Sequence, residues 1–314
     1  MLNRPLGMLV VGGAFFVACV GDSSPPAPDA STDATTPDTS TSDAATDVVQ
    51  DVPVDAAFNP ATLGNLQLWV AADVGLALSG GKMTWTDQSP QSHLVQSPND
   101  SSPCSNPTIQ TAAINGLSAA SFDGHTNCFT VSSGFNDFTN GVSIFVVAQP
   151  QNHNSPFLGA ESAFVDLSGS SAAQSAEVLF GRAYQPTNTS TGDFQLQTNN
   201  TSTTTGLIDT GSGDTYLSGV THLFEVVLPA LPEDQSGTGT LYEDGTVTGA
   251  ATNNPLGPTI AARAYNFIGW NAWEQVNSYP AYSGLIGEIL VYSSALTTSQ
   301  RQSLEAHLKS KWGL

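Results

Sequence analysis

Short runs rich in apolar, β-branched and aromatic residues recur from Phe58 onward, separated by segments of Gly, Asn, Asp, Ser and Pro. Several runs alternate polar and apolar positions, as half-buried antiparallel strands do. The clearest begin at Leu66, Ser118, Cys128, Val142, Ala176, Phe194, His222, Gly239, Tyr265 and Leu285. Asp244-Gly245 lies between two runs, and Asp-Gly is a strong hairpin signal. About ten strands without alternating helices predict an all-β, two-sheet antiparallel jelly-roll sandwich for residues 58–314.

One short helix is expected at the end of the chain. Thr297 and Gln300 form the T-x-x-Q pattern of a capping box. Leu304, Leu308 and Trp312 follow at a spacing of four residues, which places them on one helix face. We expect this face to pack on the sandwich.

Residues 1–18 have the features of a bacterial lipoprotein signal peptide. Arg4 precedes an apolar run that ends at Ala18, which is shorter than the roughly 20 residues of a membrane span. The segment Phe-Val-Ala-Cys, ending at Cys19, resembles a lipobox, in which the cysteine carries the lipid anchor. Val20 after this cysteine implies an outer-membrane destination. The alternative is an ordinary signal peptide with an incidental cysteine.

Residues 19–57 are expected to form a disordered tether. Between Val20 and Ala57 the chain has eight Asp and no Lys or Arg, with Pro, Ser, Thr and Ala between them. Such a segment has too little apolar surface to offset the entropy of ordering.

The charge of the chain excludes two classes of partner. Seven Lys and Arg stand against 27 Asp and Glu, which gives a formal net charge of −20. Nucleic acid and anionic lipid surfaces both need clustered basic residues, so neither is expected as a ligand. Contact with the membrane is therefore expected through the lipid anchor only.

Cys104 and Cys128 are expected to form a disulfide if the chain is exported to an oxidising compartment. Closing a loop of about 25 residues would stabilise the fold by roughly 3–4 kcal/mol in the chain-entropy model. Two free thiols are the alternative. Neither cysteine has a second Cys or His at the spacing of a metal site.

Four segments resemble the laminin G-like domains of the concanavalin A-like lectin/glucanase superfamily. These are LQLWVAADVGL from Leu66, INGLSAASFDGHTNCFTV from Ile114, LYEDGTVTG from Leu241, and the last strand and helix from Gly284. The resemblance implies two curved antiparallel sheets. Members of this family bind glycans or proteins, sometimes through calcium.

No catalytic residue is assigned from the sequence. The chain lacks the H-E-x-x-H and G-x-S-x-G motifs and a phosphate-binding loop. It also lacks the E-x-D-x-x-E strand of glycoside hydrolases in this superfamily. We therefore expect a protein that is not an enzyme. The alternative is a divergent glycoside hydrolase whose carboxylates come from separate strands.

Calcium is the one cofactor that the sequence suggests. The turn from Asp123 to Asn127 offers a carboxylate, an amide and free carbonyl groups, which are ligands that calcium takes. In the alternative interpretation both residues only cap the turn.

The stretch from Gly269 to Gly284 is the richest in residues suited to ligand contact. Aromatic faces stack on sugars while amides and carboxylates bond their hydroxyl groups, so we select Trp270, Asn271, Trp273 and Glu274 as ligand-binding residues. A tryptophan that plugs one end of the sandwich is the alternative. Residues 188–213 are rich in Thr, Asn, Ser and Gly, which suggests a polar hairpin at a sheet edge.

Glu288 lies in an otherwise apolar strand, and we expect it to pair with a backbone group or an arginine. Taken together, the sequence predicts a lipid-anchored envelope protein that binds a polysaccharide or a surface protein without catalysis, for adhesion or matrix contact. A structural envelope module without a small ligand is a further alternative.

Overall fold

The computed structural model describes residues 58–98, 104–151, 162–170, 175–182, 191–201, 204–210, 216–272 and 281–314. All of them belong to one compact unit, Asp55–Leu314. The predicted signal peptide, Cys19 and the tether lie outside the described residues and stay predictions. In the described ranges no helix combines the length and the apolar character that crossing a membrane requires.

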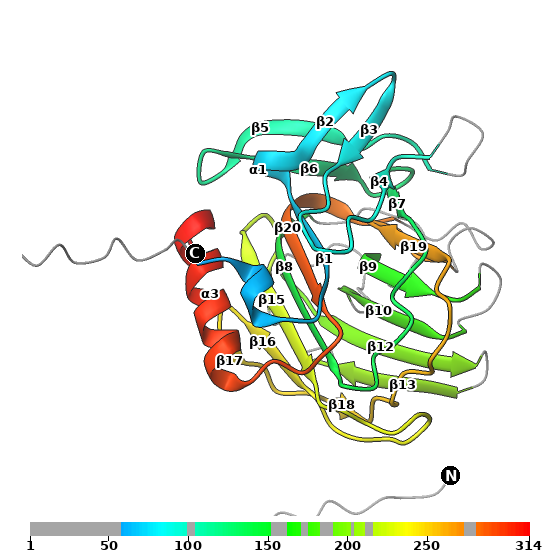
Figure 1. The fold of residues 1–314 in the computed structure, drawn as a ribbon. Helices are drawn as coiled ribbons and strands as arrows, with labels where there is room; N and C mark the ends of the chain where they lie inside the picture. Colours follow the sequence, from blue (N-terminus) through cyan, green and yellow to red (C-terminus); the bar gives the residue numbers. More distant parts are fainter. Residues whose placement is uncertain are drawn as a thin grey trace, which may run out of the picture. The chain divides into compact units, whose positions relative to one another are not determined.

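Two antiparallel sheets form most of this unit (Figure 1). Sheet A has the order β17-β16-β15-β8-β20-β6-β5, and β1 also pairs with β20. Its strands are β1 (Leu66–Ala71), β5 (Thr108–Ile114), β6 (Leu117–Asp123), β8 (Val142–Pro150), β15 (His222–Leu228), β16 (Thr240–Glu243), β17 (Thr246–Val247) and β20 (Ser283–Tyr292). Every pairing in this sheet is antiparallel.

Sheet B has the order β18-β13-β12-β10-β9-β19-β7-β4-β3-β2. Its strands are β2 (Leu76–Ser79), β3 (Lys82–Trp85), β4 (Val95–Gln96), β7 (Phe129–Val131), β9 (Ser162–Ser168), β10 (Glu177–Arg182), β12 (Phe194–Thr201), β13 (Thr204–Asp209), β18 (Thr252–Asn253) and β19 (Tyr265–Ile268). A small third sheet pairs β11 (Thr191–Gly192) with β14 (Tyr216–Leu217). Short helices are η1 (Pro60–Leu63) and α1 (Ala72–Gly75). The predicted all-β sandwich is confirmed.

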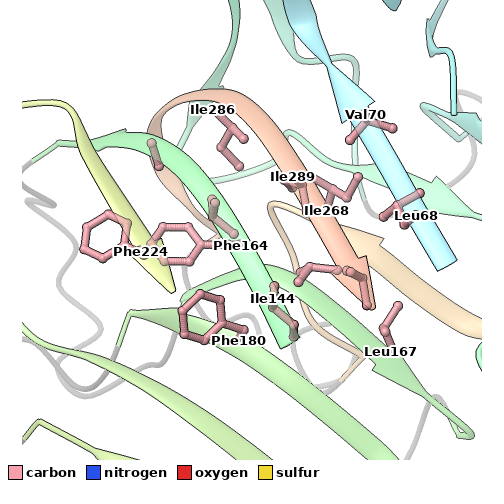
Figure 2. Packing of buried hydrophobic residues seen from close by; sticks show 14 of the residues in the cluster. Leu68, Val70, Ile144, Phe164, Leu167, Phe180, Phe224, Ile268, Ile286 and Ile289 are labelled. Atoms are coloured by element: carbon pink, nitrogen blue, oxygen red, sulfur yellow. The ribbon is translucent and has the colours of Figure 1, made fainter. Parts of the chain in front are cut away.

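The main core lies between the two sheets and follows from the two-residue period of the strands (Figure 2). On β8, Ile144 and Val146 enter this core, whereas Phe145 and Val147 point to the other face of sheet A. Alternation on sheet B likewise places Leu167 and Phe180 in the core. Both faces of β8 are therefore buried.

A register shift in β20 changes which residues face the core. The shift lies between Ile286 and Glu288, at Gly287. A Cβ atom on Gly287 would lie 2.8 Å from the Trp312 ring, so only glycine fits beneath this side chain. The shift places Glu288 on the outer face of sheet A, under the C-terminal helix.

The C-terminal helix α3 (Thr298–Trp312) forms as predicted. Thr297 and Gln300 make both bonds of the capping box, and Gly313 ends the helix in the left-handed conformation. Leu304, Leu308 and Trp312 are buried, and they form a second apolar cluster on the outer face of sheet A. The expected packing of this helix on the sandwich is confirmed.

Candidate functional site

The outer face of sheet B carries polar side chains, whereas the outer face of sheet A is apolar. On β9, β10 and β12, five side chains with amide or carboxylate groups alternate with core residues: Asp166, Glu177, Gln195, Gln197 and Asn199. Each is at most 6% exposed. Because neighbouring positions on a strand face opposite sides, these five point away from the core. We call this set the polar face.

Strand register places the polar face in adjoining rows. Asp166 lies opposite Leu179, which lies opposite Gln197. In the next row Glu177 lies opposite Asn199, whose Nδ2 donates a hydrogen bond to the Glu177 carboxylate. The five side chains therefore share one continuous patch that crosses three strands.

Two buried atoms of the polar face have no hydrogen-bond partner. They are Nε2 of Gln195 and Oδ1 of Asn199. Most buried polar atoms in proteins are paired, so unpaired ones mark places where water or a ligand can complete the bonding. A donor and an acceptor are both available here, which suits a ligand with hydroxyl groups, since a hydroxyl both donates and accepts.

The polar face also brings two carboxylates onto neighbouring strands. Asp166 on β9 lies opposite Leu179 on β10, and Glu177 is two residues before Leu179. The Cα atoms of such diagonal neighbours lie about 7–8 Å apart. The sequence left open whether carboxylates from separate strands could meet, and the strand register places these two on one face of neighbouring strands.

One hydrogen bond joins the polar face to the loop that the sequence selected for ligand contact. The backbone N–H of Ala272 donates to Oδ2 of Asp166 over 2.7 Å. Trp270 and Asn271, just before it, are 5% and 4% exposed. The loop therefore begins at the polar face, but Trp273 and Glu274 lie outside the described residues.

The side chain of Trp270 packs in a small apolar cluster with Phe267 and the two cysteines. Its indole Nε1 is buried without a hydrogen-bond partner. This environment favours the alternative in which the indole plugs the end of the sandwich. The ligand-binding role selected for Trp270 and Asn271 stays a prediction.

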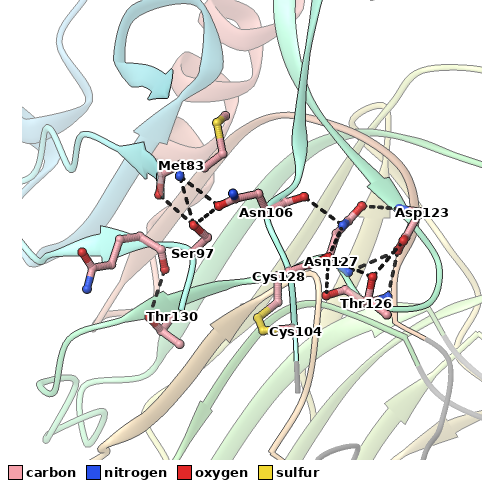
Figure 3. The surroundings of a disulfide bond; sticks show 11 residues. Met83, Ser97, Cys104, Asn106, Asp123, Thr126, Asn127, Cys128 and Thr130 are labelled. Carbon is pink, nitrogen blue, oxygen red and sulfur yellow. Dashed lines mark hydrogen bonds between the residues drawn. A yellow bond between two sulfur atoms is a disulfide. The ribbon is translucent and has the colours of Figure 1, made fainter. Parts of the chain in front are cut away.

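Cys104 and Cys128 form a disulfide, as predicted, with a Cα–Cα distance of 5.7 Å (Figure 3). Two backbone hydrogen bonds lie beside it. The Ser105 N–H donates to Thr126 O, and the Cys128 N–H donates to Ser105 O. The disulfide therefore joins the segment before β5 to the turn that follows β6.

Hydrogen bonds occupy the oxygen atoms of the turn proposed for calcium (Figure 3). Oδ1 of Asp123 accepts from the N–H groups of His125, Thr126 and Asn127, and Oδ2 accepts from the Thr126 hydroxyl. Oδ1 of Asn127 accepts from the Asp123 N–H. Burial raises the pKa of Asp123, but the hydrogen bonds lower it more, so the net shift is downward. The geometry favours the turn-capping interpretation, and calcium stays a prediction.

Sequence reasoning missed the polar face, although part of its signal was present. The run Phe-Gln-Leu-Gln-Thr-Asn from Phe194 alternates apolar and amide residues, as one strand of such a face does. The polar hairpin expected in residues 188–213 forms between β12 and β13. The expected edge position is wrong, because β12 lies between β10 and β13, and β13 pairs with β18. The sequence of β12 does not show which strands pair with it, because that depends on distant segments of the chain.

No family model matches the sequence, and no curated protein matches it. Among solved structures, the chain is similar to a Trypanosoma rangeli sialidase in complex with sialic acid, with 11% identity and a TM-score of 0.47 over 79% of this chain and 33% of that one. The chain thus spans about a third of the sialidase's length.

Two further solved structures share a similarity with the chain. The Ruminococcus gnavus IT-sialidase CBM40 bound to α2,3-sialyllactose has 14% identity and a TM-score of 0.39, over 56% of this chain and 94% of that one. A SAP-like pentraxin from Limulus polyphemus has 18% identity and a TM-score of 0.39, over 59% and 80%. At these identities and TM-scores the similarities assign no family to the chain.

Proposed function

We propose that this protein binds carbohydrate, without cleaving it, through the polar face of sheet B. The observation that supports this most is the pair of buried, unpartnered atoms, Gln195 Nε2 and Asn199 Oδ1, within a patch of amides and carboxylates. Sugar hydroxyl groups would complete these hydrogen bonds after the glycan displaces the atoms that cover this face, since each of its side chains is at most 6% exposed. The side chains are already held by the sheet, so little conformational entropy is lost on binding.

The charge on and around the polar face defines the class of glycan. Asp166 and Glu177 lie within the face, and the chain has a formal net charge of −20. Anionic polysaccharides would meet like charge, which disfavours their approach. We therefore expect a neutral glycan.

The sequence suggests where this binding takes place. Lipidation at Cys19 and a tether over residues 19–57 would display the domain on the bacterial cell envelope. In this arrangement the protein contacts extracellular polysaccharide, as an adhesion or matrix-binding module does.

The test is a glycan-array screen of the full chain, followed by titration with the neutral glycan that binds. We expect Gln195→Ala and Gln197→Ala to weaken binding about tenfold or more, because each removes hydrogen bonds worth roughly 1–3 kcal/mol. Gln110→Ala is the matched control, since Gln110 is exposed on β5 of sheet A. A folded chain that binds no glycan, or equal affinity in all three variants, would overturn the proposal.

The second candidate function is glycan hydrolysis, and the diagonal placement of Asp166 and Glu177 on neighbouring strands favours it. A hydrolase would release reducing ends from the bound glycan, and both Asp166→Asn and Glu177→Gln would abolish this release. Our primary proposal instead expects the glycan to remain intact after long incubation. Detection of reducing ends that depend on both carboxylates would replace binding with hydrolysis.

A further inference from the structure

Three metal-ligating side chains converge at one end of sheet A, away from the strands of the polar face. His222 is the first residue of β15, Glu243 is the last residue of β16, and Asp244 begins the turn to β17. Nδ1 of His222 lies 2.9 Å from Oδ2 of Asp244 and 3.2 Å from Oε1 of Glu243. All three ligand atoms lie within 4.8 Å of one another.

The fold holds this cluster in place before any ligand binds. Asp244 and Gly245 have φ values of 50° and 77°, as a type I′ turn requires. The other oxygen of Asp244, Oδ1, accepts from Leu223 N–H over 2.8 Å. Lys309 of α3 donates to the Asp244 carbonyl over 2.7 Å, which fixes the turn against the helix. The side chains therefore have little freedom to separate.

The cluster places two carboxylates beside one imidazole. A protonated His222 would supply one positive charge for two carboxylates, and one Nδ1–H would serve both. Among the described residues, Lys309 carries a positive charge at this turn, and its ammonium donates to the Asp244 carbonyl and to Glu305 rather than to the carboxylates of the cluster. A divalent cation would neutralise both carboxylates beside a neutral imidazole.

We propose that His222 Nδ1, Glu243 Oε1 and Asp244 Oδ2 bind a divalent first-row transition-metal ion such as Zn²⁺. Ligands at the 2.0–2.2 Å typical of zinc lie about 3.0–3.5 Å apart, close to the two spacings seen here. An imidazole with two carboxylates suits zinc or its neighbours, whereas Ca²⁺ and Mg²⁺ prefer all-oxygen ligands.

The burial of the three side chains indicates how the site is closed. Those of His222 and Glu243 are 9% and 13% exposed, while that of Asp244 is 38% exposed. The ion is thus enclosed by protein on the side of His222, where the ring contacts Tyr216 and Phe224. The side of Asp244 is open to solvent. This site does not depend on the proposed carbohydrate binding.

Binding of Zn²⁺ alone to the full chain tests the proposal. The chain is stripped with a chelator and titrated by calorimetry, and Co²⁺ is used in parallel as a spectroscopic probe of nitrogen and oxygen ligands. Asp244→Asn is the diagnostic variant, because Asn-Gly also favours the type I′ turn and the fold should persist. Asp234→Asn is the matched control, since Asp234 is exposed and has a φ of 59°.

We expect one tight Zn²⁺ site per chain in the native protein and in Asp234→Asn, and at least a tenfold loss of affinity in Asp244→Asn. At one fixed Zn²⁺ concentration, the melting temperature should rise more in the first two proteins than in Asp244→Asn. If Asp244→Asn does not fold, Glu243→Gln replaces it. Equal Zn²⁺ affinity in the native chain and the folded variant, or no binding at all, would overturn the proposal.

Discussion

The indole Nε1 of Trp312, at the end of α3, lies 2.7 Å from Oε2 of Glu288 in the centre of β20. The same carboxylate accepts from Trp69 Nε1 over 2.6 Å and from Lys311 Nζ over 2.8 Å. Glu288 is fully buried. One carboxylate therefore connects β1, β20 and the C-terminal helix. We expected a backbone group or an arginine as its partner, and the structure instead provides two indoles and a lysine.

Replacing Glu288 with alanine should destabilise the protein strongly. The variant leaves two buried indole N–H groups without their acceptor and leaves Lys311 paired with Asp73 alone. Breaking a buried ion pair typically costs about 3–5 kcal/mol. Urea unfolding of Glu288→Ala should show this loss in the free energy of unfolding. Glu233→Ala, at an exposed position, is the control and should change stability by less than about 0.5 kcal/mol. Similar stability for both variants would contradict the central role of this carboxylate.

The elements with local signals could be predicted from the sequence. The capping box at Thr297 and the Asp244-Gly245 hairpin each depend on residues only a few positions apart, and both formed as expected. The partners of Glu288 could not be predicted, because Trp69 is 219 residues away along the chain. The register shift at Gly287, which turns Glu288 toward the helix, could not be predicted either. Its prediction requires knowing that Trp312 packs against Gly287.

Stability should depend on pH through Glu225, a second buried acid beneath α3. Burial raises its pKa to about 7, although the hydrogen bond and charge of Arg301, 2.9 Å away, act in the opposite direction. The unfolded chain has an ordinary pKa of 4.5 at this residue. Between these two values the folded state binds more protons, so this residue's contribution to stability is complete near pH 4.5 and is lost as the pH rises toward 7.

Glu225→Gln isolates this effect from the other titrating groups. Its free energy of unfolding should rise relative to that of the native chain as the pH increases from about 4.5 to about 7. Urea unfolding at several pH values measures the difference. Glu243 also titrates in this range, but it is present in both proteins and cancels. Parallel pH profiles for the two chains would show that the pKa of Glu225 is not raised.

The site was harder to predict than the fold because it is assembled across strands. Gln195 and Asn199 belong to one strand, but Asp166 and Glu177 reach them only through the pairing of β9, β10 and β12. His222 and Asp244 are likewise 22 residues apart and meet because β15 pairs with β16. Side-chain alternation shows which residues share a face of one strand, but not which strand lies beside it.

Trp270→Ala should reduce stability rather than act on glycan binding alone. The Trp270 side chain packs against the disulfide and Phe267, and truncating a buried tryptophan typically costs about 3–5 kcal/mol. Thermal unfolding and glycan titration of the same preparation separate the two roles. A variant that melts like the native chain but binds no glycan would make Trp270 a ligand-stacking residue after all.

Substitution of Asp123 tests whether the turn from Asp123 to Asn127 binds calcium. Its carboxylate accepts four hydrogen bonds from His125, Thr126 and Asn127. Asp123→Ala leaves these donors without their acceptor, so we expect a loss of about 1–3 kcal/mol in stability. If the residue only caps the turn, the loss should be equal with calcium and with a chelator. Melting of the native chain should then also be unchanged by calcium. A calcium-dependent rise in the native melting temperature that Asp123→Ala abolishes would instead establish the turn as a calcium site.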